Sequence, residues 1–188
     1  VMKDFHKNNR SQIANQMKED SLLLLFAGEA PKKSADAAYD FTPNRNFYYM
    51  TGIDEEHVIL ALRKTAGKVE EILFIKRRDP VMVKWVGETI SEERAKEGSG
   101  VEEIRYLDTF EGFLNQSIFK DDLARIYLDL EKDSYGSLDT AGVRFAKEIT
   151  AKYPQVRVKN IYNEICKLRL YKKPEEIILM KKAIAITK

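Results

Sequence analysis

The chain has 188 residues, of which 44% are hydrophobic and 33% are charged, and its formal net charge is +2. This composition is that of a globular protein with room for one full-sized domain, and it excludes a disordered or fibrous chain. The small net charge excludes a broad basic field, so we expect neither nucleic acid nor a membrane as a partner. A single cysteine, Cys166, excludes an internal disulfide, and no signal-peptide pattern is evident, which favours the cytoplasm.

The first quarter of the chain predicts a helix, a buried strand and a loop. Residues 4–17 are good helix formers with a few apolar positions, and Asp4 can cap their start. Residues 22–26 form a continuous apolar run of strand length, far too short to span a bilayer. Residues 32–42 are small and polar, which indicates a loop.

The next segments are a short aromatic stretch and a β-hairpin. Residues 47–50 read Phe-Tyr-Tyr-Met and end at Thr51-Gly52, and we expect Tyr48 and Tyr49 to pack under the sheet. Two strand-like runs, residues 58–62 and 71–75, flank a turn in which Gly67 suits a positive φ. Their scarcity of polar positions predicts a sheet that is covered on both faces.

Helix-like and strand-like segments alternate through the second half of the chain. Ser91 can cap a helix that continues to Lys96. Beyond it, strands are expected at 101–106, 124–130 and 156–161, and helices at 109–119, at 139–153 and around Cys166. This alternation is typical of βαβ units, whereas the hairpin adds antiparallel strands. The sequence therefore predicts an α/β fold, a three-layer α/β/α sandwich with a mixed sheet.

The last segment predicts a helix with a broad apolar stripe. Pro174 suits the first helical position, and the two glutamates after it suit the positive end of the helix dipole. Apolar residues then recur at helical spacing, so the helix should bury one face. The helical recurrence of apolar residues continues to the end of the sequence at Lys188, and we expect this helix to begin a second domain. The alternative is that the helix docks on the chain's own domain.

Residues that could carry catalysis or bind a metal do not gather in the sequence. His6 and His57 lie on unrelated segments without a metal-ligand partner at helical or turn spacing. A metal site at residues 54–57, Asp-Glu-Glu-His, would need side chains that converge, whereas an extended backbone directs alternate side chains to opposite faces. We therefore expect these residues to form a solvated turn. We therefore expect neither catalytic residues nor metal ligands in this chain.

Three stretches together resemble a known family. They are residues 40–53, with Asn-Phe-Tyr-Tyr-Met-Thr-Gly at their centre; residues 78–80 with 84–87; and residues 168–177 with 180–183. In order and spacing they are similar to the amino-terminal domain of Xaa-Pro aminopeptidase (aminopeptidase P) and its prolidase and creatinase relatives. The resemblance covers essentially the whole chain.

The resemblance implies an α/β amino-terminal domain with a ribonuclease H-like motif at 1–170. Residues 171–188 would then be a linker and the first helix of a "pita-bread" catalytic domain outside this chain. That domain would hold two divalent metals, manganese in most relatives, on five ligands that do not map onto this sequence. The chain alone would not be an enzyme, and its parent would be a metallo-aminopeptidase or dipeptidase that cleaves Xaa-Pro peptides.

The resemblance also implies roles for the amino-terminal domain itself. It would support a homo-oligomer and substrate access, with Trp85 close to the active site of a neighbouring subunit. Trp85 could instead simply cover the sheet edge, and Arg78 and Asp79 could pair to fix its loop. Two other functions stay open: a stand-alone peptide- or protein-binding module of the same fold, and a pure dimerisation element.

Overall fold

The computed structural model of the chain describes residues 2–35, 37–77 and 89–186. Within them lies a six-stranded sheet in the order β6-β5-β4-β1-β7-β8. Its strands are β1 (Ser21–Phe26), β4 (Ile59–Thr65), β5 (Lys68–Ile75), β6 (Glu103–Tyr106), β7 (Arg125–Leu128) and β8 (Arg157–Asn160). β4 is antiparallel to β1 and to β5, whereas the β5–β6, β1–β7 and β7–β8 pairs are parallel. The mixed sheet predicted from the sequence is confirmed.

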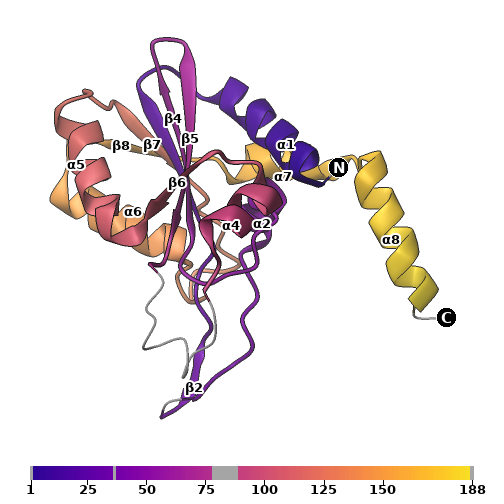
Figure 1. Cartoon of the computed structure of the whole chain (residues 1–188). Coiled ribbons are helices and arrows are strands. Elements are labelled where there is room, and N and C mark those ends of the chain that lie inside the picture. The colour runs from indigo at the N-terminus through magenta and orange to yellow at the C-terminus, as the bar shows by residue number, and fades with distance from the viewer. Residues whose placement is uncertain (1, 36, 78–88, 187–188) are drawn as a thin grey trace.

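Helices cover both faces of this sheet, so the chain forms the predicted three layers (Figure 1). One face carries α1 (Met2–Gln16), α2 (Arg45–Thr51), α4 (Glu92–Ser99) and α7 (Tyr162–Leu170). The opposite face carries α5 (Phe110–Phe119), which follows the 3-10 turn Leu107–Thr109, and α6 (Ala141–Lys152). No helix in the described part of the chain has both the length and the apolar character needed to cross a membrane.

The apolar run of β1 lies at the centre of both hydrophobic cores. Leu23 and Leu25 belong to the core under α1, α2 and α7, whereas Leu22 and Leu24 belong to the core under α5 and α6. All four are at most 1% exposed. A strand buried on both faces has no polar alternation, which explains the continuous apolar run in the sequence.

The β4–β5 hairpin turns at Ala66 and Gly67, whose φ angles are 50° and 72°. Two consecutive left-handed residues give the twist that matches right-twisted strands. The predicted positive φ of Gly67 is confirmed, and Ala66 adopts the same region despite its side chain.

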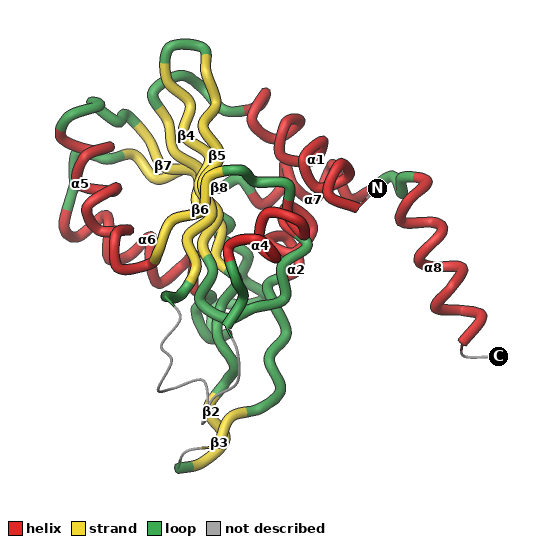
Figure 2. Tube along the Cα trace, in the orientation of Figure 1, coloured by secondary structure: helices red, strands yellow, loops and turns green. Residues whose placement is uncertain are grey.

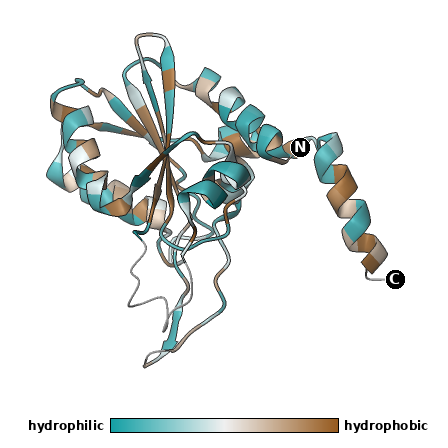
Figure 3. Ribbon diagram, in the orientation of Figure 1, coloured by the Kyte–Doolittle hydropathy of each residue, from teal (hydrophilic) through white to brown (hydrophobic). Residues whose placement is uncertain are grey.

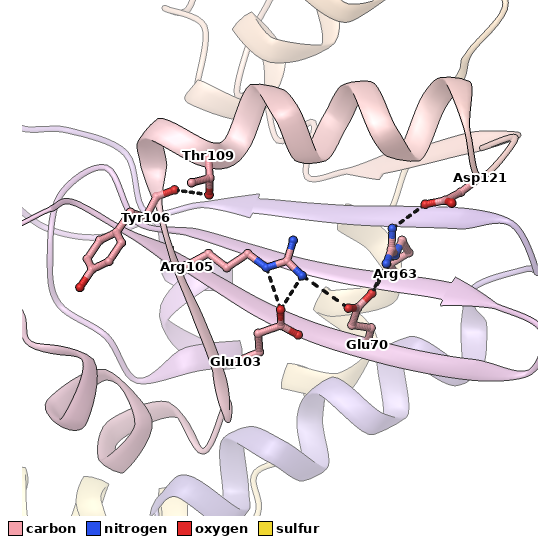
Figure 4. A network of polar contacts seen from close by, with 7 residues as sticks. All are labelled: Arg63, Glu70, Glu103, Arg105, Tyr106, Thr109 and Asp121. Carbon is pink, nitrogen blue, oxygen red and sulfur yellow. Dashed lines mark hydrogen bonds and ion pairs between the residues drawn. The ribbon is translucent and has the colours of Figure 1, made fainter.

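A network of charged side chains ties the β6 edge of the sheet together (Figure 4). Glu70 lies between two arginines: it accepts a hydrogen bond of 2.8 Å from Arg63 Nε and lies 3.7 Å from Arg105 Nη2. Arg105 also bonds Glu103, and Arg63 reaches Asp121 beyond α5 at 2.6 Å. Arg63 and Arg105 therefore each have at least one carboxylate partner.

Several local predictions were wrong. Residues 32–42 contain a small exposed hairpin, β2 (Lys32–Ser34) with β3 (Ala37–Ala38), which projects from the body (Figure 2). The residues of its two strands are all exposed, so the sequence carries no apolar signal for it. α1 begins at Met2, which places Asp4 in its first turn and not at its cap. The helix expected around Cys166 is present as α7, and the cysteine is half-buried in it.

The last helix, α8 (Pro174–Ile186), extends away from the body (Figure 3). The predicted helix is confirmed, but none of its residues is buried within this chain. Ile177, Ile178 and Met180 are 41%, 53% and 50% exposed, and Ile186 is 85% exposed. The apolar stripe thus faces solvent in the described chain, and docking onto the chain's own body, the alternative considered for it, is not observed.

Candidate functional site at the junction of two sequence motifs

The fold brings together two of the three sequence stretches that stand out. The aromatic stretch forms α2, and residues 168–177 form the end of α7 and the start of α8. The two lie side by side at the point where the chain leaves the body, with α1 packed against both α2 and α7. We call this meeting point the junction, formed by α2, the end of α7 and the start of α8.

The short helix α2 is fixed at both ends. Its N-cap Asn44 accepts hydrogen bonds from the backbone N–H groups of Asn46 and Phe47, at 2.9 and 3.0 Å. Gly52 ends the helix in the left-handed region, at a φ of 66°. The Tyr49 carbonyl near the helix end lies 3.0 Å from both His6 Nδ1 and Asn9 Nδ2, so α1 supplies donors for an otherwise free carbonyl.

A buried side-chain relay connects α2 to the sheet and to α7. Asn46, which is fully buried, donates through Nδ2 to Asp129 Oδ2 at 2.8 Å. Its Oδ1 accepts from Arg169 Nη1 at 2.6 Å. Because Asp129 directly follows β7 and Arg169 lies near the end of α7, one amide fixes the position of three elements.

The start of α8 is fastened to the body by a lysine and a tyrosine. Lys173 donates to Asn9 Oδ1, and its Nζ lies 5.3 Å from the ring centre of Phe5 and 5.9 Å from that of Tyr49. The Tyr49 hydroxyl donates to the Leu168 carbonyl at 3.1 Å. Glu176 accepts from the Lys173 backbone N–H at 2.9 Å, which caps the first turn of α8.

Burial shifts three pKa values at the junction. Burial, and then the charge of Glu176, raise the pKa of Tyr49 to about 12, so its phenol remains a hydrogen-bond donor at neutral pH. Burial lowers the pKa of Lys173 from its ordinary value, against the opposing charge of Glu176. Burial also lowers the pKa of His6, which favours its neutral form.

A groove of about 610 Å³ opens between α2 and α8. Its lining combines aromatic, aliphatic and charged side chains: Thr42, Pro43, Arg45, Tyr48, Tyr49, Asp54, Arg169, Lys172, Glu176, Leu179 and Met180. Tyr48 is 46% exposed in this groove, so the prediction that it packs under the sheet was wrong, whereas Tyr49 is buried as expected. The mixed lining suits the docking of a protein surface more than catalysis.

The other candidate residues lie apart from this groove or outside the described residues. Trp85, Arg78 and Asp79 fall within 78–88, which the structure does not describe. His57 lies in an exposed turn, with Nδ1 4.0 Å from Glu29 Oε2. Among the described residues, no group of three or more His, Cys, Asp or Glu side chains could hold a metal ion.

The polar residues that build the junction could not be identified from the sequence. Asn46, Asp129 and Arg169 are far apart in the chain, and no local pattern indicates that one amide bridges them. Lys173 directly precedes the predicted helix start at Pro174, yet its ammonium reaches Asn9, 164 positions away. The sequence pattern around His6 indicates a helix but does not show that this side chain is buried.

We predict that protonation of His6 destabilises the chain. Its folded-state pKa is lowered, so below about pH 6.5 the unfolded chain binds a proton that the folded chain refuses. The free energy of unfolding should therefore fall as the pH drops from about 6.5 toward the lower folded-state pKa, by at most about 1.4 kcal/mol per pH unit from this group. Urea titrations between neutral and mildly acidic pH would measure the slope.

His6→Asn should keep a donor near Tyr49 and flatten this slope. His57→Asn, in the exposed turn at a φ of 62°, is the matched control and should retain it. Equal slopes in wild type and His6→Asn would contradict the prediction.

The fold and the junction define the class of this protein: a three-layer α/β domain with a groove beside an outward-pointing helix. The sequence profile of the family "Aminopeptidase P, N-terminal domain" matches residues 6–127, and the chain belongs to this family. The family resemblance read from the three stretches is thereby confirmed.

Relatives in bacteria and animals match nearly the whole chain. Xaa-Pro aminopeptidase of Haemophilus influenzae is 30% identical over 98% of this chain and 41% of its own length. Human Xaa-Pro aminopeptidase 3 is 28% identical over 95% of this chain and 35% of its own length. The chain therefore spans about two fifths of the length of the curated relatives it matches.

Solved structures show the same fold. A structure from Bacillus anthracis, assigned to aminopeptidase P, superposes with a TM-score of 0.95 at 46% identity over 100% of this chain and 45% of its own. Aminopeptidase P from E. coli with the inhibitor Pro-Leu gives a TM-score of 0.79 at 23% identity, covering 97% of this chain and 42% of its own, which supports the fold alone.

Proposed function

We propose that this chain is the non-catalytic amino-terminal domain of a Xaa-Pro aminopeptidase or dipeptidase. In this proposal residues 1–170 form the domain, and residues 171–188 are the linker and first helix of a catalytic pita-bread domain. The observation that carries it is the junction: a polar network fixes the start of α8, and the helix then presents its apolar stripe outward. The names of the relatives, and the share of their length that the chain spans, agree with it.

The exposed stripe of α8 supports a second domain as its cover. A large aliphatic side chain gains about 1.5–3 kcal/mol when it is fully buried, so several exposed in a row favour association. Ile177, Met180 and Ile184 are each at least 41% exposed, and Leu179 and Met180 also line the junction groove. One contiguous surface on α8 and α2 could thus be covered in a single packing event.

The catalytic domain would hold two divalent metals, manganese by the family resemblance, and these would supply the hydrolytic chemistry. We place both metals in that domain because the five ligands implied by the family resemblance do not map onto this sequence. A lone half-buried cysteine agrees with a cytoplasmic protein.

An activity assay tests whether the catalytic activity resides outside this amino-terminal domain. We expect the purified 188-residue chain to leave Xaa-Pro peptides intact with added manganese, and the complete product of its gene to cleave them. Manganese-dependent cleavage by the chain alone would refute the proposal. A complete product that folds and binds metal but cleaves no Xaa-Pro peptide would favour the binding-module alternative.

We also propose that the domain supports a homo-oligomer and places Trp85 near the active site of a neighbouring subunit. A rigid aromatic side chain can form an apolar wall for a substrate residue. Trp85→Ala in the complete gene product should lower kcat/KM on Xaa-Pro peptides by roughly tenfold without unfolding the protein. Trp85→Phe, which keeps an apolar ring, should lose less; unchanged kinetics in the alanine variant would exclude a substrate role.

A further inference from the structure

A second groove, of about 450 Å³, lies on the opposite side of the sheet from the network of Figure 4, at the β7–β8 edge. Residues from the end of α1, from both strands and from the start of α7 line it. Four of the lining residues are cationic, namely Lys18, Arg125, Arg157 and Lys159. The chain as a whole carries a formal charge of only +2, so this groove is a local concentration of positive charge.

The register of the two strands places these cations on one face. In the parallel β7–β8 pair, Arg125 is opposite Arg157 and Tyr127 is opposite Lys159. Tyr127 packs in the core under α1 and α7, and alternate residues of a strand share a face, so both arginines and Lys159 belong to that face. Like charges directly opposite each other destabilise a sheet.

The four cations of the groove form no ion pairs with carboxylates in the part of the chain that the structure describes. Glu164 is the one acidic residue in the lining, and it bonds Lys167 at 3.1 Å. On the β6 edge, by contrast, Arg63 and Arg105 are each paired with carboxylates.

Protection of the sheet edge explains only part of this arrangement. Charged residues on an edge strand discourage pairing with other chains, which accounts for Arg157 and Lys159 on β8. It does not account for Arg125, which lies one strand further in and whose Nη1 donates to the Glu19 carbonyl at 3.2 Å.

We propose that this groove binds a compact anion that carries two or more phosphates. Neighbouring strands are about 4.8 Å apart and alternate residues about 6.6 Å apart, so the three strand cations enclose a small triangle. Adjacent phosphoryl groups place several negative charges within such a span, and the planar guanidinium matches phosphate oxygens in pairs. An acidic peptide added along β8 would meet Arg157 and Lys159 but leave Arg125 behind them, so a compact ligand fits better.

The groove has the volume of a small-molecule site, and nucleotides and inorganic oligophosphates share this chemistry. The proposal is independent of the peptidase assignment.

Calorimetry with the 188-residue chain at low ionic strength, where screening is weak, tests the proposal. The probes are inorganic triphosphate, ATP and a hexaglutamate peptide. We expect triphosphate to bind with one-to-one stoichiometry and to shift the backbone amide signals of Arg125, Tyr127 and Lys159 in NMR spectra. Equal affinity for ATP would indicate a free oligophosphate, and at least tenfold tighter binding of ATP would indicate a nucleotide.

Paired charge variants locate the site. Arg157→Gln with Lys159→Gln should weaken triphosphate binding at least tenfold. Lys32→Gln with Lys33→Gln, on the exposed β2–β3 hairpin, removes the same charge elsewhere and should leave the affinity within about twofold. Absent binding, equal weakening in both variants, or tighter binding of hexaglutamate than of triphosphate would each overturn the proposal.

Discussion

Replacement of Arg10 with methionine is expected to lower the free energy of unfolding by about 3 kcal/mol. Arg10 is fully buried, and its Nη1 donates to the carbonyls of Met50 and Ser99, each at 2.8 Å. Its Nε donates to Glu71 Oε2 at 3.0 Å. One guanidinium thus bonds the ends of α2 and α4 and a carboxylate on β5, and a methionine of similar length leaves all three acceptors without their donor.

The size of the expected loss in unfolding free energy depends on the acceptors that lose their donor when Arg10 is replaced. Removing one partner of a buried charged pair costs about 3–5 kcal/mol, and the lower end applies here because the Glu71 side chain is 24% exposed. Native domains are stable by only about 5–15 kcal/mol, so the variant should unfold at a clearly lower urea concentration. Arg10→Lys should recover only part of the loss, because an ammonium cannot reproduce the planar fork.

Arg77→Met is the matched control for this measurement. Arg77 bonds Asp108 through Nε and Nη2, at 2.9 and 3.2 Å, but its side chain is 58% exposed. Solvent replaces those bonds, so the urea midpoint should stay near that of wild type. A similar shift of the urea midpoint in both variants would show that the buried Arg10 contributes no more stability than the exposed Arg77.

Features that depend on local pattern were predictable from the sequence. The apolar run of β1, the hairpin around Gly67 and the alternation of strands and helices all follow from side-chain periodicity and turn chemistry. These local patterns predict both the α/β class and the mixed sheet. The helix α8 was also predictable, because its proline and glutamates mark a helix start and its apolar residues recur at helical spacing.

Features that depend on long-range contact were not predictable. Asn46 is an ordinary polar residue in the sequence, and only the packed structure shows it between Asp129 and Arg169. The exposure of Tyr48 depends on which face of α2 meets α1, and a seven-residue helix is too short for its periodicity to specify that face. The groove at β7–β8 likewise needs the strand register, which places Arg125 opposite Arg157.

Gly142 is a position at which a single added methyl group should strongly destabilise the fold. An ideal Cβ built there would lie 2.4 Å from the Asp129 carbonyl oxygen, because the first turn of α6 packs directly on the end of β7. The opposing atom belongs to the backbone, so no side-chain rotation can relieve the clash. We expect Gly142→Ala to lower the free energy of unfolding by about 3 kcal/mol, the upper end for an overpacked site.

Gly112→Ala gives the opposite sign and is therefore the control. Gly112 lies within α5, and a Cβ there would meet nothing within 4 Å. In an open helical position alanine is favoured over glycine, so this variant should gain about 0.5–1 kcal/mol. Urea unfolding of the two variants would measure the difference, and a gain at both positions would contradict the close contact of α6 with β7.

The same contact links Gly142 to the junction. Asp129 lies under Gly142 and also accepts the hydrogen bond from Asn46 that positions α2 and, through Arg169, the end of α7. If the methyl group displaces the Asp129 backbone, amide hydrogen exchange should accelerate at Phe47 and Tyr48 in α2 while α5 stays protected. Destabilisation without faster exchange in α2 would mean that the strain is absorbed within α6 and does not reach the junction.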